Sequence, residues 1–281
     1  MTAQQQLNLD LRYFPAEGAQ EAEIRAHWNA AKTGTIVCDM WDQHWCANAT
    51  YRVREMTPRM NEVLHALRNM GCTIAHAPSD TMGYYQDAPQ RIRTLELAEG
   101  VELPVCPQAS QRLEREPPMA VDRDHIECDC EGEKCQCRQA WSRQIPGLNI
   151  ESPDLIGDNL ELLQAFSKLG ITNVIMMGVH TNMCVVGRAF GIRNLLRYGF
   201  DTVLVRDMTD CRAPQDEAPF FNHYTALDYA VRHIERYLCP TVASGQLIGD
   251  GQTFRFAADT RESVPDLAAL EIQARRLMKQ E

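Results

Sequence analysis

The sequence has little positive charge and no long hydrophobic run. Its 28 lysines and arginines stand against 38 aspartates and glutamates, giving a formal net charge of −10 and a pI near 5.3. This balance argues against nucleic acid or an anionic membrane as the main partner. No stretch approaches the roughly eighteen consecutive apolar residues of a membrane span. The start, MTAQQQLNLDLRYF, lacks the basic residues and apolar run of a secretory signal. We therefore expect a cytoplasmic protein.

The remaining composition is that of an ordinary globular protein. Hydrophobic residues make up 44% and charged residues 23% of the 281 positions, which is enough for a sizeable core. The length suits one large domain or two small ones. Eleven cysteines are an odd number, so at least one thiol must be unpaired within a monomer.

Apolar runs of strand length alternate with amphipathic helical segments. The pattern predicts strands at 34–40, 72–78, 173–179 and 201–207, and helices at 57–70, 158–170, 181–198 and 223–238. Strands that alternate with helices of this length predict βαβ units, and right-handed crossovers then place helices on both faces of the sheet. We expect an α/β fold with a mainly parallel sheet.

The chain is expected to form a single domain over residues 1–281. Its core spans about 32–240, preceded by an extended arm with a short helix. A cysteine-rich insertion covers about 105–147, where apolar periodicity is weak, and residues 241–281 form a C-terminal extension.

Two polar residues lie at the carboxyl ends of predicted strands, where sheets of this kind bind ligands. Asp39 closes the first strand, as a functional carboxylate or as a helix-cap or turn aspartate. Cys184 falls in the first turn after the third strand, with Thr181 or Asn182 as the cap. Backbone N–H groups and the helix dipole there would lower the pKa of the thiol and make it a nucleophile. A small buried thiol fits the position equally well.

Both positions belong to longer motifs. GVHTNMCVVGRAFG (178–191) resembles the Gly-Val-x-Thr-Asn-x-Cys-Val signature of the isochorismatase-like cysteine hydrolases, which include nicotinamidases, N-carbamoylsarcosine amidase and ureidoacrylate hydrolases. IVCDMWDQHWC (36–46) resembles the first-strand motif of that superfamily, and the likeness spans some three quarters of the chain. It implies a three-layer α/β/α fold of Rossmann-type topology, a homo-oligomer (dimer or tetramer), and catalysis that requires no cofactor.

The resemblance also implies roles for individual residues. The superfamily uses a Cys-Asp-Lys triad, so Cys184 would attack a carbonyl carbon and Asp39 would take the thiol proton and later pass it to the leaving nitrogen. A cis peptide before His180 would aim the N–H groups of His180 and Cys184 at the oxyanion.

The lysine of that triad is missing from its expected place. The chain has only four lysines, and none lies suitably between the second strand and the strand that carries the cysteine. That segment reads RQAWSRQIPGLNI, so Arg143 is the candidate replacement and Arg138 the second choice. An arginine can hold a thiolate and a carboxylate by charge, but it cannot readily move a proton. For Arg188 we expect an interior salt bridge or a subunit contact.

Several residues near Asp39 are candidates to contact a small-molecule substrate. They are His44, Trp45, His76 and Tyr85. The nicotinamidases bind a metal through an aspartate and two histidines after the second strand, and the loop HAPSDTMGYY lacks that histidine pair. Hydrogen-bonded loop residues beside a pocket are the alternative interpretation.

ECDCEGEKCQC places four cysteines in ten residues, namely Cys128, Cys130, Cys135 and Cys137. Four thiolates can hold a structural zinc, although C-x-C spacing is less favourable than C-x2-C. Two disulfides or free thiols are the alternatives. A zinc ion or a pair of disulfides would fix the middle insertion. The superfamily pattern does not include this cysteine cluster.

The sequence therefore predicts a cysteine hydrolase that cleaves a C–N bond of a small amide, carbamoyl or ureido compound through a thioester. One alternative is a vinyl-ether hydrolase of the isochorismatase type, which works without a nucleophilic cysteine. The other is a non-catalytic binding or scaffold protein that keeps the fold, which the missing lysine leaves open.

Overall fold

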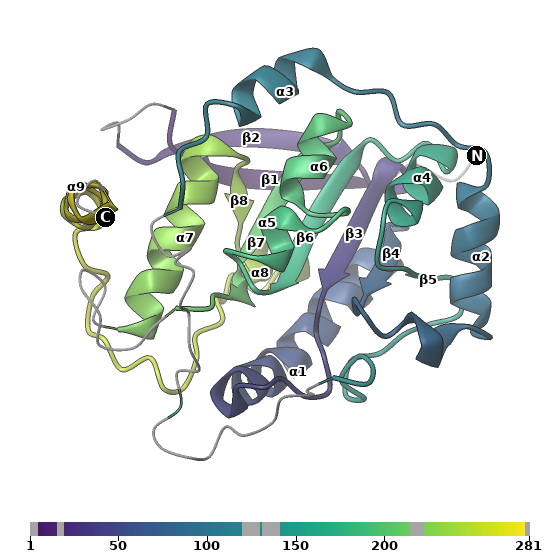
Figure 1. The fold of residues 1–281 in the computed structure, drawn as a ribbon, viewed down its shortest axis with the longest axis horizontal. Coiled ribbons are helices and arrows are strands. Elements are labelled where there is room, and N and C mark those ends of the chain that lie inside the picture. Colours follow the sequence, from purple (N-terminus) through teal and green to yellow (C-terminus); the bar gives the residue numbers. More distant parts are fainter. Residues whose placement is uncertain (1–4, 16–19, 120–129, 131–140, 214–221, 279–281) are drawn as a thin grey trace.

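The computed structural model describes residues 5–15, 20–119, 130, 141–213 and 222–278 (Figure 1). The strands are β1 Gln6–Tyr13, β2 Ala22–Asn29, β3 Thr33–Cys38, β4 Thr73–Ala77, β5 Leu155–Ile156, β6 Asn173–Val179, β7 Asp201–Asp210 and β8 Thr241–Val242. The helices are α1 Ala47–Asn69, α2 Pro89–Ala98, α3 Pro107–Leu113, α4 Glu161–Lys168, α5 Cys184–Gly187, α6 Ile192–Arg197, α7 His223–Tyr237, α8 Ser244–Ile248 and α9 Leu267–Met278, with 3-10 turns at Ala30–Lys32 and Met82–Tyr85.

These strands form a sheet in the order β2-β1-β8-β7-β6-β3-β4-β5. Strands β3 to β8 are parallel, whereas β1 is antiparallel to both β2 and β8. The crossover from β3 to β4 runs in one direction along the sheet, whereas the crossovers from β5 through β6 and β7 to β8 run back. Right-handed connections therefore place α1 on one face and α4, α6 and α7 on the other. Figure 1 shows α4 to α7 in front of the sheet and α1 behind it. The predicted three-layer α/β/α fold with a mainly parallel sheet is confirmed.

The central strands are buried on both faces. Every residue of β3 and β6 is buried, which explains why these strands read as continuous apolar runs. The two strands approach closely at Gly178, where a Cβ would lie 2.0 Å from the carbonyl oxygen of Cys38. Gly178 also has φ +110°, a region that suits glycine. The motif glycine before Cys184 therefore sets the close approach of the two strands that carry the site.

Three elements differ from the sequence prediction. Helix α1 begins at Ala47, ten residues before the start predicted at residue 57. The N-terminal arm is a β-hairpin, in which Leu7, Leu9 and Leu11 alternate inward as a half-buried strand requires. The helix predicted over 181–198 is two short helices, α5 and α6. The break follows Arg188, whose backbone is extended, and the tight return at Gly191 leaves only 2.9 Å between a Cβ there and the nitrogen of Arg188.

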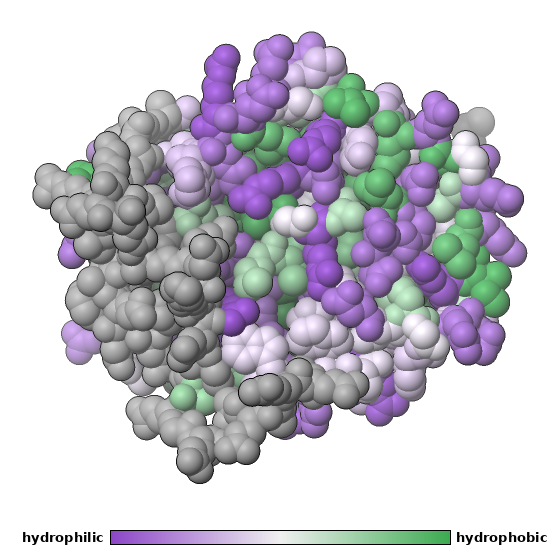
Figure 2. Space-filling model, viewed as in Figure 1, coloured by the Kyte–Doolittle hydropathy of each residue, from purple (hydrophilic) through white to green (hydrophobic). Residues whose placement is uncertain are grey.

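The part of the chain that the structure describes contains no helix that is both long enough and apolar enough to cross a bilayer. On the face drawn in Figure 2, hydrophobic residues lie in small separate groups among hydrophilic ones.

Candidate functional site

Asp39 and Cys184 meet at the carboxyl edge of the parallel strands. Strand β3 ends beside β6, with Cys38 paired to Gly178, so Asp39 follows one strand where His180 follows the other. The peptide between Val179 and His180 is cis, as the resemblance implies. The chain then turns, and Cys184 begins α5. Adjacent parallel strands thus bring together two residues that are far apart in the sequence.

Asp39 is a fully buried carboxylate with a left-handed backbone (φ +48°). One of its oxygens accepts a hydrogen bond of 2.8 Å from the backbone N–H of Ser79, and the other lies 3.4 Å from Nε of Arg188. Burial raises the pKa of Asp39 to about 6, against the opposing charge of Arg188 and the contacts with Cys184 and Ser79. Asp39 is therefore ionised at neutral pH and close enough to its pKa to accept and return a proton.

The thiol of Cys184 is protonated in the resting site. Burial, and then the negative charge of Asp39, raise its pKa to about 12. The expectation of a lowered thiol pKa is wrong, because burial and the charge of Asp39 together raise it. Cys184 is nevertheless partly exposed to solvent. A base in contact with the thiol would be needed to activate it, and Asp39 lies in that position.

The guanidinium beside Asp39 belongs to Arg188. Its Nε lies 3.4 Å from Asp39 and its Nη2 lies 2.9 Å from the carboxylate of Asp80. Burial opposes the charge of Arg188, but the Asp39 and Cys184 charges and Asp80 outweigh it and raise the pKa of Arg188. The interior salt bridge expected of Arg188 is present, and it holds the aspartate of the proposed triad.

Arg143 makes its contacts elsewhere. Its Nη1 donates to the hydroxyl of Tyr84 over 2.7 Å, the guanidinium lies 5.3 Å from the Tyr84 ring centre, and its backbone N–H donates to Asp42. These contacts support Arg188 rather than Arg143 as the cation of the site, while Arg138 lies outside the described residues. The sequence argument missed Arg188 as this cation because it sought the cation only between the second strand and the strand that carries the cysteine. The signal was present in the i,i+4 spacing of Cys184 and Arg188.

Aromatic side chains gather beside the site. His44 is buried, and its ring centre lies 4.8 Å from that of His180 and 4.7 Å from that of Trp45. Trp41 stacks on Trp141 at 4.0 Å. His44, Trp45 and His180 line a small cavity of about 10 Å³, the space of about one water molecule. Burial, followed by the neighbouring His44, lowers the pKa of His180 well below its usual value, so its ring is neutral.

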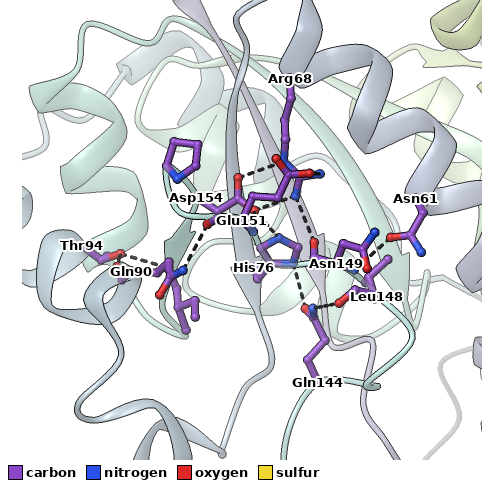
Figure 3. A network of polar contacts seen from close by, with 12 residues as sticks. Asn61, Arg68, His76, Gln90, Thr94, Gln144, Leu148, Asn149, Glu151 and Asp154 are labelled. Atoms are coloured by element: carbon purple, nitrogen blue, oxygen red, sulfur yellow. Dashed lines mark hydrogen bonds and ion pairs between the residues drawn. The ribbon is translucent and has the colours of Figure 1, made fainter.

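His76 and Tyr85 serve a different part of the structure. His76 is fully buried, with its ring nitrogens 2.9 Å from Gln144 and 3.1 Å from Asp154 (Figure 3). Tyr85 is also buried and accepts a hydrogen bond of 2.9 Å from the backbone N–H of Gln144. Arg68 of α1 pairs with Asp154 at 2.6 Å in the same network. These contacts fix the segment from Gln144 to Asp154 against β4, so they support a structural role for both residues.

A second buried ion-pair network supports the turn that holds Cys184. Asp210 at the end of β7 accepts from Arg52 and from His223, each over 2.7 Å. Burial raises the pKa of Asp210, but the charge of Arg52 and the contact with His223 outweigh it and hold that pKa well below its usual value. The carbonyl of Asp210 accepts from the backbone N–H of Thr181 over 2.8 Å. Sequence reasoning missed this network, since nothing in the spacing links positions so far apart.

The cysteine cluster is described at one position. The sulfur of Cys130 lies 3.8 Å from that of Cys46 and accepts a hydrogen bond from the backbone N–H of Asn48. The cluster positions 128, 135 and 137 lie outside the described residues. Among the residues that are described, no three metal-binding side chains converge.

Comparison with known proteins places the fold. No family profile matches the chain, and no curated protein sequence does. A cysteine hydrolase from Pseudomonas syringae pv. phaseolicola 1448A superposes over 79% of this chain and 93% of its own, at a TM-score of 0.50 and 16% identity. An isochorismatase from Pseudomonas putida KT2440 covers 77% and 90% (TM-score 0.44, 14%), and N-carbamoylsarcosine amidase from Thermoplasma acidophilum covers 76% and 96% (0.38, 13%). The chain therefore shares the overall fold of that cysteine hydrolase.

Proposed function

We propose that the protein is a cysteine hydrolase that cleaves the C–N bond of a small amide, carbamoyl or ureido compound through a thioester. The observation that carries the proposal is the meeting of Asp39, Cys184 and Arg188 at the carboxyl edge of the sheet. A neutral thiol beside an ionised, buried carboxylate is a nucleophile paired with its base.

In the first half of the reaction the sulfur of Cys184 attacks the substrate carbonyl carbon while its proton passes to Asp39. The N–H of Cys184 belongs to the first turn of α5, where intrahelical partners are lacking, and with the N–H of His180 it would bind the oxyanion. Collapse of the tetrahedral intermediate breaks the C–N bond, and protonated Asp39 returns its proton to the leaving nitrogen. An amine or ammonia departs, and an acyl group stays on the sulfur.

In the second half a water molecule attacks the thioester carbon and gives its proton to Asp39. The C–S bond breaks, the acid is released, and Asp39 returns the proton to the sulfur of Cys184. Arg188 takes no part as a proton carrier, because a guanidinium stays charged in proteins. It stabilises ionised Asp39 and the negative charge that develops on the sulfur.

Trapping the acyl intermediate tests this proposal directly. A panel of small amides, carbamoyl and ureido compounds is incubated with the protein, quenched in acid and read by peptide mass spectrometry. We expect an added acyl mass on the peptide that carries Cys184 for the true substrate class. Turnover without any such adduct, even with slowly hydrolysed analogues, would favour the vinyl-ether mechanism. A panel that shows neither turnover nor adduct would favour the binding protein.

The rate should depend on pH through Asp39. As a general base Asp39 must be ionised, so kcat/KM is expected to fall as pH drops through about 6. Between pH 7 and 8 the rate should be flat, because the Cys184 thiol, with a pKa raised to about 12, does not ionise there. A rate that instead climbs through pH 8 to 9 would mean that a preformed thiolate limits the reaction.

A homo-oligomer and a structural zinc at the cysteine cluster are further parts of the proposal, and one distance bears on the zinc. Two sulfurs on one tetrahedral zinc, at Zn–S distances of about 2.3 Å, lie about 3.8 Å apart, which matches the Cys46–Cys130 separation of 3.8 Å. Cys46 therefore joins the cluster as a candidate ligand, and it was not one of the four cysteines considered from sequence. A disulfide between the same two sulfurs would require them to approach to about 2.05 Å.

A further inference from the structure

A second cavity, of about 720 Å³, lies beside α7. The sheet contributes Arg12 and Arg206, α7 contributes Tyr224 and Arg232, and residues 253–267 close the cavity from outside. In Figure 1 the C-terminal segment leads from α8 past one end of α7 to α9. None of the three residues of the proposed active site lines this cavity.

Most arginines of the cavity wall are paired with acids, and the wall also contains Glu21, Glu262 and Asp266. The pairs are Arg12 with Glu235 (2.7 Å), Arg261 with Asp228 (2.8 Å) and Arg255 with Asp259 (3.1 Å). Asp207 is satisfied differently, because its carboxylate accepts from the backbone N–H groups of Ser244 and Phe254. Each of these acids already has a hydrogen-bond partner. Glu235, Asp207 and Glu21 lie near enough to favour the charge of Arg206, but none of them forms an ion pair or a hydrogen bond with it.

Two guanidiniums in the wall are left over. Within the described part of the chain, neither Arg206 nor Arg232 makes a hydrogen bond or an ion pair, and Nη1 of Arg206 and Nε of Arg232 are buried without a partner. Arg232 rests on the ring of Phe14, at 4.1 Å from the ring centre. Burial lowers the pKa of both arginines from the usual value, which reflects the cost of holding these charges away from water.

The rest of the wall is aromatic. Tyr224 stacks on Phe256 at 5.7 Å between ring centres, and Phe254 meets Phe256 edge-on at 5.1 Å. A cavity that combines apolar surface with a few polar groups suits a small organic ligand. The guanidinium of Arg206 favours a ligand with an anionic group, because arginine binds carboxylate and phosphate through paired hydrogen bonds.

We propose that this cavity binds a small organic anion whose carboxylate or phosphate pairs with Arg206 and whose apolar body lies against Tyr224 and Phe254. Arg232 adds positive potential from α7. This site is distinct from the Cys184 centre and takes a different class of ligand from the neutral amides of the proposed reaction.

Calorimetric titration of the full chain tests the proposal. The probes are 3-phenylpropionate, phenyl phosphate, inorganic phosphate and the uncharged 3-phenylpropanol. We expect saturable binding of the two aromatic anions, at least tenfold weaker binding of inorganic phosphate, and none of the alcohol. Arg206→Met should weaken the aromatic anions at least tenfold, whereas Arg255→Met, which alters a paired and exposed arginine of the same wall, should not. Arg188→Gln separates this cavity from the proposed active site, and binding should persist in it.

Thermal unfolding without a probe supplies an independent readout. Because Arg206 has no partner to lose, Arg206→Met should unfold at the same temperature as the parent protein or higher. A lowered unfolding temperature would assign Arg206 to the fold. Unchanged binding in Arg206→Met, equal binding of inorganic phosphate, or no binding of either aromatic anion would each overturn the proposal.

Discussion

Replacing Cys184 with alanine is expected to lower the rate of amide hydrolysis on the order of 10³-fold or more, with the fold intact. The variant loses the atom that forms the thioester, and the remaining oxyanion donors cannot replace a missing nucleophile. Its partial exposure, at the start of a four-residue helix, limits the structural cost to about 1 kcal/mol. The measurement is kcat/KM on the best substrate of the panel, together with thermal unfolding of both proteins.

Cys72 offers a matched control. It is a buried core thiol whose pKa burial raises to about 12, the same value that burial and Asp39 give Cys184. Cys72→Ala should cost stability and leave kcat/KM within about twofold of the parent value. Retention of full activity in Cys184→Ala would rule out the thioester and bring the vinyl-ether mechanism forward. Equal losses in the two variants would trace the effect to folding.

The positions of Asp39 and Cys184 could be predicted because they depend on strand ends. A continuous apolar run locates a buried parallel strand, and the residue that follows it must lie at the carboxyl edge. The protonation state of Cys184 could not be predicted in the same way. It depends on burial and on the distance to a carboxylate from another strand, and neither can be read from local sequence.

Other errors have specific physical causes. The alternation of Leu7, Leu9 and Leu11 was a strand signal, but polar flanking residues obscured it. His76 lies near the end of β4 and was expected to face the substrate. Since both faces of that strand are covered, its ring instead meets Gln144 and Asp154, which come from a segment without clear periodicity.

Replacing Arg188 with glutamine is expected to lower kcat/KM at pH 7 by roughly 10- to 100-fold. Arg188 is the opposite charge 3.4 Å from Asp39, and it opposes the rise in pKa that burial causes. Without it the pKa of Asp39 rises above about 6, by about 1 to 3 units for a charge at this distance. Less of the base is then ionised at neutral pH. The acid limb of the rate profile should therefore move to higher pH, and part of the lost activity should return at pH 8 to 9.

The upward shift of the acid limb separates this role from a merely structural one, which would lower the rate equally at every pH. Arg188→Lys keeps the charge and should retain more activity than Arg188→Gln, with a smaller shift of the limb. Arg143→Gln is the matched control, since Arg143 is an arginine paired with the Tyr84 hydroxyl rather than with Asp39. If Arg143→Gln moved the limb and Arg188→Gln did not, the cation of the triad would be Arg143. The contact between Arg188 and Asp39 would then be a salt bridge that serves only the fold.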